Sequence, residues 1–74
     1  MCGYSTSDFW VASFLKVKGF RILNVRREAG RSVFIFEDRP DREGLLRDFY
    51  NNASVGVNDI KSAAQDIRAL IHNI

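Results

Sequence analysis

The sequence predicts an α+β fold in the order helix, hairpin, helix, helix (αββαα), within a single domain over residues 1–74. Two runs of strand-forming residues flank a polar centre that contains Gly30, the short-range pattern of a β-hairpin. Near the C-terminus, apolar residues recur at spacings of three and four, which indicates an amphipathic helix. A two-stranded ribbon is only marginally stable in water, so helices must cover the hairpin. The hairpin alone makes a two-stranded antiparallel sheet. Tyr4 is positioned to add a short strand, and with it the sheet is three-stranded.

The first element is a helix over about 7–18. Gly19 ends it in the left-handed conformation, which lets Phe20 fold back on Leu15 in a Schellman ending. Apolar residues spread over more than half of the helix circumference and leave Ser13 outside, so we expect cover on more than one side. The side chains that can accept hydrogen bonds from the first turn are those of Thr6, Ser7 and Asp8.

The hairpin covers about 20–37, and its register depends on the loop. We favour a three-residue loop, 28–30, because Ala29 disfavours positive φ. This loop pairs Arg21 with Glu37 at the base. It places four apolar side chains on one face of the ribbon, those of Leu23, Val25, Val33 and Ile35.

A two-residue loop is the alternative, and it shifts the pairing by one residue. Leu23 and Val25 then lie opposite Phe34 and Phe36. Either register leaves apolar groups on both faces, as in a strand that is covered on both sides.

A second helix follows over about 40–51, with Pro40 suited to its first position. Its stripe of leucine and aromatic residues faces the core, and the rest of its surface is charged. Asp38 and Arg42 are four residues apart in the favourable acid-first order, and such a pair contributes about 0.3 to 0.5 kcal/mol.

The third helix covers about 58–73 and begins at a cap formed by Asn58 or Asp59. It carries the strongest periodic pattern in the chain, typical of a helix that buries one face. The apolar residues of this stripe are Ile60, Ala63, Ala64, Ile67, Leu70, Ile71 and Ile74.

Composition restricts the class of protein. Hydrophobic residues make up 46% and charged residues 27% of the chain, which is ordinary for a globular protein and argues against disorder. No apolar run approaches the length of a membrane span, and the N-terminus lacks the regions of a signal peptide, so we expect a cytoplasmic protein without membrane contact. The net charge of +2 is too small to imply nucleic-acid binding by itself.

Several stretches of the chain resemble a family of short bacterial and phage domains of unknown function: YSTSDF, KGFRI, REAGRSVFIFED, RDFYN and the closing amphipathic helix. The resemblance spans nearly the whole chain. Its motifs are helix caps, a glycine stop, a turn and core positions. It therefore implies a fold and carries over no catalytic or binding residue.

The basic hairpin is one candidate functional site. Guanidinium groups on a ribbon can contact phosphates, as they do in ribbon proteins that bind DNA. Exposed strands also carry positive side chains simply to prevent aggregation at their edges. The residues that would contact nucleic acid are Arg21, Arg26, Arg27 and Arg31.

Self-association is the other candidate. A hairpin with two apolar faces needs two layers of cover, and a second chain can complete the core of a small domain. The predicted contact residues of such a homodimer are Phe34 and Phe36. The competing interpretation is a monomer in which the first helix covers one face and the last helix the other.

The sequence shows no constellation of residues for catalysis, cofactor binding or metal binding. His72 is the only histidine and has no partner nearby, helix capping explains Ser5, Thr6 and Ser7, and Cys2 is a single thiol. We therefore expect no cofactor and infer no small-molecule substrate. The predicted function is a small non-catalytic interaction module that self-associates through the hairpin; the alternative is an accessory nucleic-acid-binding domain, and an enzyme ranks third.

Overall fold

The computed structural model describes residues 3–73 and has the predicted α+β fold. A strand at Tyr4 precedes the first helix, which confirms the third strand. The elements, in chain order, are β1 (Gly3–Thr6), α1 (Phe9–Val17), β2 (Ile22–Glu28), β3 (Arg31–Glu37), α2 (Arg42–Tyr50) and α3 (Val57–His72).

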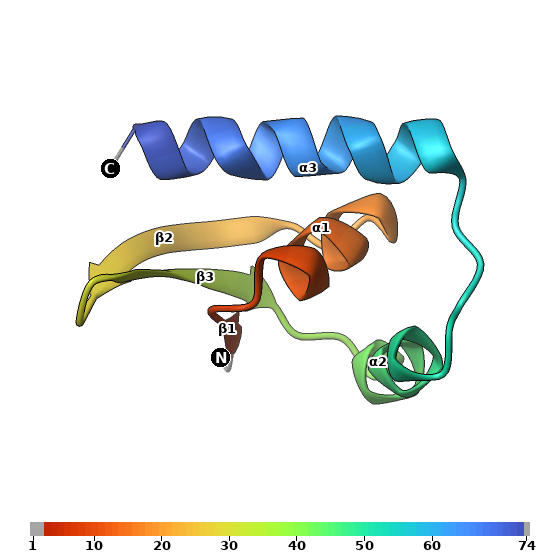
Figure 1. The fold of residues 1–74 in the computed structure, drawn as a ribbon. Coiled ribbons are helices and arrows are strands. Elements are labelled where there is room, and N and C mark those ends of the chain that lie inside the picture. Colours follow the sequence, from red (N-terminus) through yellow and green to blue (C-terminus); the bar gives the residue numbers. More distant parts are fainter. Residues whose placement is uncertain (1–2, 74) are drawn as a thin grey trace.

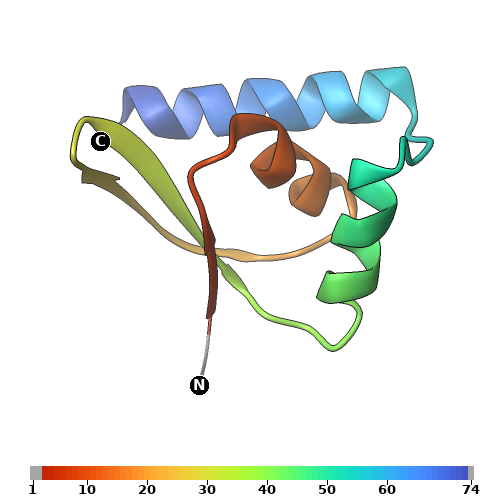
Figure 2. The ribbon, with the colours of Figure 1, turned by 60° about the horizontal axis from the view of Figure 1, so that its bottom comes forward.

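The three strands form one antiparallel sheet in the order β1-β3-β2, so that β3 is central. Helix α1 lies between α3 and the sheet, and α2 lies beside them near the end of β3 (Figure 1). Neither Figure 1 nor Figure 2 shows a helix over the opposite face of the sheet. We call the covered side the inner face and the other side the outer face.

The hairpin turn differs from the favoured prediction. Glu28 pairs with Arg31, so the loop has two residues, and the expected three-residue loop is wrong. Ala29 and Gly30 both have positive φ, 51° and 79°, as a type I′ turn requires. This turn has the twist of the flanking strands, and that match outweighs the strain of a left-handed alanine.

A bulge in β2 then changes the register. Asn24 pairs with Ile35 but Ile22 pairs with Phe36, so Leu23 is an extra residue without a partner. Beyond the bulge, the N–H of Glu37 donates to the carbonyl oxygen of Arg21 over 3.0 Å, which is the base pairing that the longer loop predicted. The base of the hairpin therefore follows one predicted register and its tip follows the other.

The turn provides a matched pair of tests. Ala29→Gly is expected to raise the free energy of unfolding by about 0.5–1 kcal/mol, because relief of left-handed strain exceeds the entropy that glycine adds to the unfolded chain. Gly30→Ala should lower it by about 1–2 kcal/mol. A Cβ atom at Gly30 would meet nothing within 4 Å, so the loss reports backbone conformation alone. Urea denaturation followed by circular dichroism measures both, and a destabilising Ala29→Gly change would contradict the assigned turn.

Of the three candidate caps of helix α1, Thr6, Ser7 and Asp8, the structure uses Asp8. The carboxylate of Asp8 accepts hydrogen bonds from the N–H groups of Trp10 and Val11, over 2.8 and 3.0 Å. At the other end Gly19 has φ 87°, and the N–H of Phe20 donates to the carbonyl of Leu15 over 3.1 Å. The cap and the Schellman ending are both confirmed.

The starts of α2 and α3 differ from the predictions. Helix α2 begins at Arg42 rather than Pro40, because Pro40 lies in a turn that the Arg42 N–H closes on the carbonyl of Arg39 over 3.0 Å. Helix α3 begins at Val57 with Gly56 at its N-cap. The predicted caps, Asn58 and Asp59, therefore lie inside its first turn.

The core lies between the inner face of the sheet, α1 and α3. Five consecutive residues of α1, 11–15, are buried, which confirms cover on more than one side. Ser13 is among them, contrary to expectation, and its hydroxyl donates to the Phe9 carbonyl over 2.9 Å, so its burial leaves no unpaired polar group. The buried apolar residues of the main cluster are Val11, Ala12, Phe14, Leu15, Phe20, Phe34, Phe36, Leu46 and Ile67.

Candidate interaction surface

The outer face of the sheet follows from the register. Residues directly opposite in an antiparallel pair share a face, and successive residues alternate between faces. Phe34 points into the core, so its neighbours Val33 and Ile35 point outward. Their partners Arg26 and Asn24 share the outer face.

An apolar strip crosses this face, formed by Leu23, Val33 and Ile35. The side chain of Leu23 is placed here by the bulge and is 52% exposed. A Cβ atom at Gly3 would lie 3.0 Å from Ile35 Cγ2 and 3.9 Å from Leu23 Cδ1, so these two side chains meet beside the bare backbone of β1. A Cβ atom at Gly3 would also lie 3.0 Å from the carbonyl oxygen of Phe36, so a larger residue would crowd both the strip and β3.

Charged side chains of both signs border the apolar strip. Arg26 and Glu28 form an ion pair of 3.0 Å. Arg31 lies next to them and donates from Nη1 to the Ser7 hydroxyl over 3.3 Å. Glu37 lies opposite Gly3 at the other end of the face. The outer face therefore has an apolar centre and a rim that carries both signs of charge.

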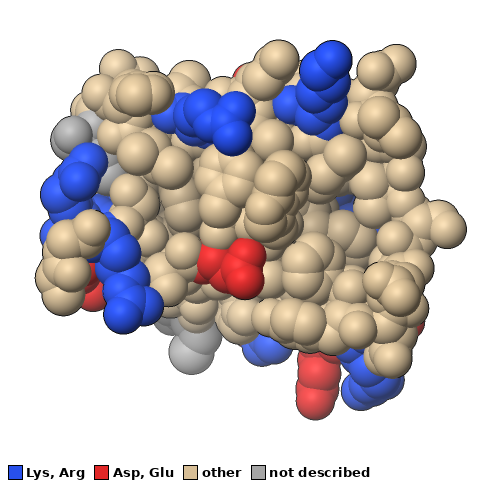
Figure 3. All heavy atoms as spheres, viewed as in Figure 1, with Lys and Arg blue, Asp and Glu red and all other residues tan. Residues whose placement is uncertain are grey.

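The predicted nucleic-acid contacts are all exposed, but they do not form one surface. Arg26 and Arg27 are consecutive in β2, so they point to opposite faces of the sheet. The charge of Arg26 is balanced by Glu28. Figure 3 shows basic side chains where the hairpin turns and others over α3, with uncharged surface between them. The residues concerned are Arg21, Arg26, Arg27 and Arg31.

Phe34 and Phe36, the predicted self-association residues, are buried within one chain. Their exposed fractions are 1% and 0%, because α1 and α3 cover the inner face. This corrects the expectation for these two residues, since neither presents surface to a partner. The larger aromatic side chains of β3 signalled this arrangement, because they bury the most apolar area. Nothing in the sequence signalled the bulge that turns Leu23 outward.

The free edge of β2 is poorly suited to pairing with another strand. The N–H of Val25 donates to the side-chain oxygen of Asn24 over 2.9 Å, so this donor is satisfied within the strand. The bulge at Leu23 also interrupts regular spacing along the edge. A bulge, or a backbone N–H that is already hydrogen-bonded within its own strand, protects the edge of a sheet from pairing with a strand of another chain. Strand addition at the β2 edge is thus disfavoured.

Two ion pairs lie where the segment after β3 leads into α2. The Asp38–Arg42 pair, predicted from spacing, is confirmed at 3.0 Å, and the guanidinium of Arg42 lies 4.3 Å from the centroid of the Tyr4 ring. Arg39 pairs with Asp41 over 2.8 Å. Hydrogen bonds from the arginines hold the pKa of both carboxyl groups below the usual value, so the pairs persist to mildly acidic pH. They have a structural role.

The other candidate residues are dispersed. His72 is exposed in the last turn of α3, Thr6 accepts a hydrogen bond from the Asp8 N–H over 3.1 Å, and Cys2 lies outside the described residues. Within residues 3–73, no group of three His, Cys, Asp or Glu side chains is placed to hold a metal ion. No helix in this part of the chain is long and apolar enough to span a membrane.

Comparisons with known proteins found no match among curated proteins or among solved structures. One family model, described as "Domain of unknown function (DUF5659)", matches residues 1–73. This range contains every strand and helix described above. The chain therefore belongs to the DUF5659 family.

Proposed function

We propose that the protein is a small, non-catalytic interaction module that binds a second copy of itself through the outer face of its sheet. The observation that carries the proposal is the apolar strip, which combines Leu23 with Val33 and Ile35 on a face without a covering helix. A small domain gains core by pairing such faces, and two sheets pack stably when their apolar sides meet. In this proposal the hairpin still forms the dimer interface. The contact residues are those of the apolar strip, because Phe34 and Phe36 are buried within one chain.

The rim supports a second copy as the partner. A twofold axis brings the same patch of both chains together, so a patch that carries both signs of charge can be complementary to itself. Arg31 and Glu37, which form no ion pair within residues 3–73, can then face each other across the twofold axis. An apolar centre inside a polar rim is also the usual anatomy of a protein interface.

Leu23→Asp tests the proposal by sedimentation equilibrium. We expect the unsubstituted protein to dimerise and the variant to bind itself at least 100-fold more weakly, because a carboxylate would be buried without a partner. Val57→Asp is the matched control, since Val57 is 76% exposed on α3, far from the outer face. A concentration-independent monomer mass for the unsubstituted chain, or equal weakening by both variants, would reject the outer-face dimer.

Nucleic-acid binding stays a prediction with weaker support. The ion pair between Arg26 and Glu28 lowers the positive potential at the hairpin tip, and Arg27 points away from Arg31. Phosphate contacts would appear as steep salt dependence of binding to DNA or RNA. We also propose a cytoplasmic location, which rests on the composition of the chain.

A further inference from the structure

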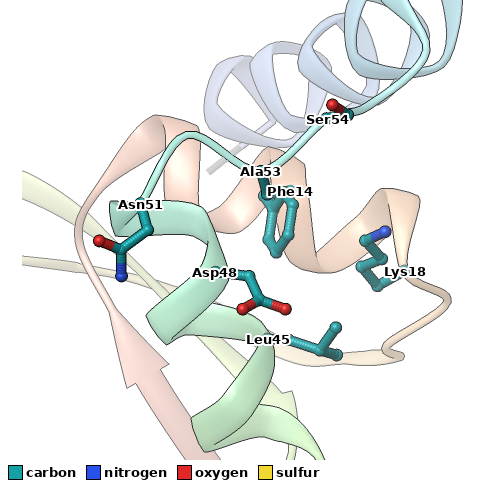
Figure 4. Close-up of a pocket in the computed structure, with 7 residues that line it drawn as sticks. All are labelled: Phe14, Lys18, Leu45, Asp48, Asn51, Ala53 and Ser54. Atoms are coloured by element: carbon teal, nitrogen blue, oxygen red, sulfur yellow. The ribbon is translucent and has the colours of Figure 1, made fainter.

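A small pocket of about 290 Å³ lies between α1, α2 and the segment that joins α2 to α3. Phe14 and Leu45 form its apolar part, and Lys18, Asp48 and Ser54 contribute polar groups. Figure 4 shows these side chains around one space, supplied by three separate parts of the chain. The volume is near the lower end of the range for small-molecule sites.

Two opposite charges face this space without neutralising each other. Lys18 enters from the end of α1 and Asp48 from α2 (Figure 4). Among residues 3–73, the ion pairs are formed by other side chains, and neither Lys18 nor Asp48 takes part in one. The Lys18 ammonium instead lies 5.4 Å from the centroid of the Phe14 ring. The pocket wall thus offers one charge of each sign to a ligand that carries both signs.

The backbone around the pocket adds to this pattern. Helix α1 ends at Val17 and α2 ends at Tyr50, so the C-terminal ends of both helices border the pocket. Carbonyl groups at helix C-termini favour a positively charged group nearby. The side-chain amide of Asn51 donates to the Arg47 carbonyl over 2.8 Å, which leaves its oxygen free to accept. An ammonium group is therefore favoured beside Asp48 in the last turn of α2, whereas at the end of α1 the Lys18 ammonium itself meets this preference.

From this geometry we propose that the pocket binds a free α-amino acid with an apolar side chain. The ligand's ammonium group contacts Asp48, its carboxylate contacts Lys18, and its side chain lies against Phe14 and Leu45. Both polar contacts are charge-assisted, the stronger class of hydrogen bond. The site is distinct from the outer face, so its occupancy does not depend on dimerisation.

Backbone amide NMR with L-leucine as the probe tests this site. We expect saturable shifts at residues 18, 48 and 54, with a dissociation constant on the order of 1 mM, as suits a small ligand in an open pocket. N-acetyl-L-leucine lacks the ammonium group and L-leucinamide lacks the carboxylate. Each should bind at least tenfold more weakly than L-leucine.

Variants separate specific binding from general affinity for the surface. Lys18→Met and Asp48→Asn should each weaken L-leucine binding at least tenfold, while the matched controls Lys61→Met and Asp66→Asn on α3 should leave it unchanged. Unperturbed shifts elsewhere in the spectrum verify that each variant is folded. The proposal is overturned if L-leucine gives no saturable shifts at roughly fifty times the expected constant. It is equally overturned if both analogues bind as well as L-leucine, or if Asp48→Asn has no effect.

Discussion

Phe36→Ala is expected to lower the free energy of unfolding by about 3–5 kcal/mol, the usual loss when a buried phenylalanine is truncated. Phe36 is fully buried in the central strand, where it lies between Tyr4 of β1 and Ile22 of β2. A domain of this length has a total stability of about 4–11 kcal/mol. The loss is therefore a large share of the total, and a domain at the lower end of this range would unfold at room temperature.

Urea denaturation followed by far-ultraviolet circular dichroism measures this loss. Tyr50→Ala is the control, because Tyr50 is 70% exposed and its truncation leaves no internal cavity. We expect the control to change stability by less than about 1 kcal/mol. Comparable losses for the two variants would contradict the assignment of Phe36 to the core.

Ile67→Ala should lower the free energy of unfolding by about 2–5 kcal/mol. Ile67 is fully buried in the middle of α3, at the contact between α3 and α1. Because α3 packs mainly on α1, we expect the loss to appear first as faster hydrogen exchange along α3, ahead of the sheet. The control is Val57→Ala, which truncates an exposed side chain of the same helix. Uniform acceleration of exchange across the whole chain would show that α3 does not open separately.

The end of α1 at Gly19, and its start to within three residues, were predictable because they depend on neighbours in the sequence. Asp8 needs only the N–H groups two and three residues ahead, and Gly19 needs only its own left-handed conformation. The core stripe of α3 was predictable for a similar reason, since a spacing of three and four residues places its members on one side of any helix. Both are local rules that hold before tertiary packing.

The turn was less accessible to sequence reasoning. Ala29 disfavours positive φ, and this local preference favoured a longer loop. The structure accepts the strained alanine because a type I′ turn lets the strands twist together, and strand pairing spreads that benefit over the whole ribbon. The bulge at Leu23 then restores the register at the base. A local rule failed here because pairing along the ribbon outweighs the preference of one residue.

The sequence by itself determined the α+β class, the position of the hairpin, the apolar stripe of α3 and the C-terminal end of α1. Only the tertiary structure decided which face of the ribbon is covered, because alternation places apolar residues on both faces and does not distinguish them. With α1 and α3 on one side of the sheet, Phe34 and Phe36 are buried, whereas Leu23, Val33 and Ile35 lie on the open side. The candidate interaction surface is the face that three short helices leave uncovered.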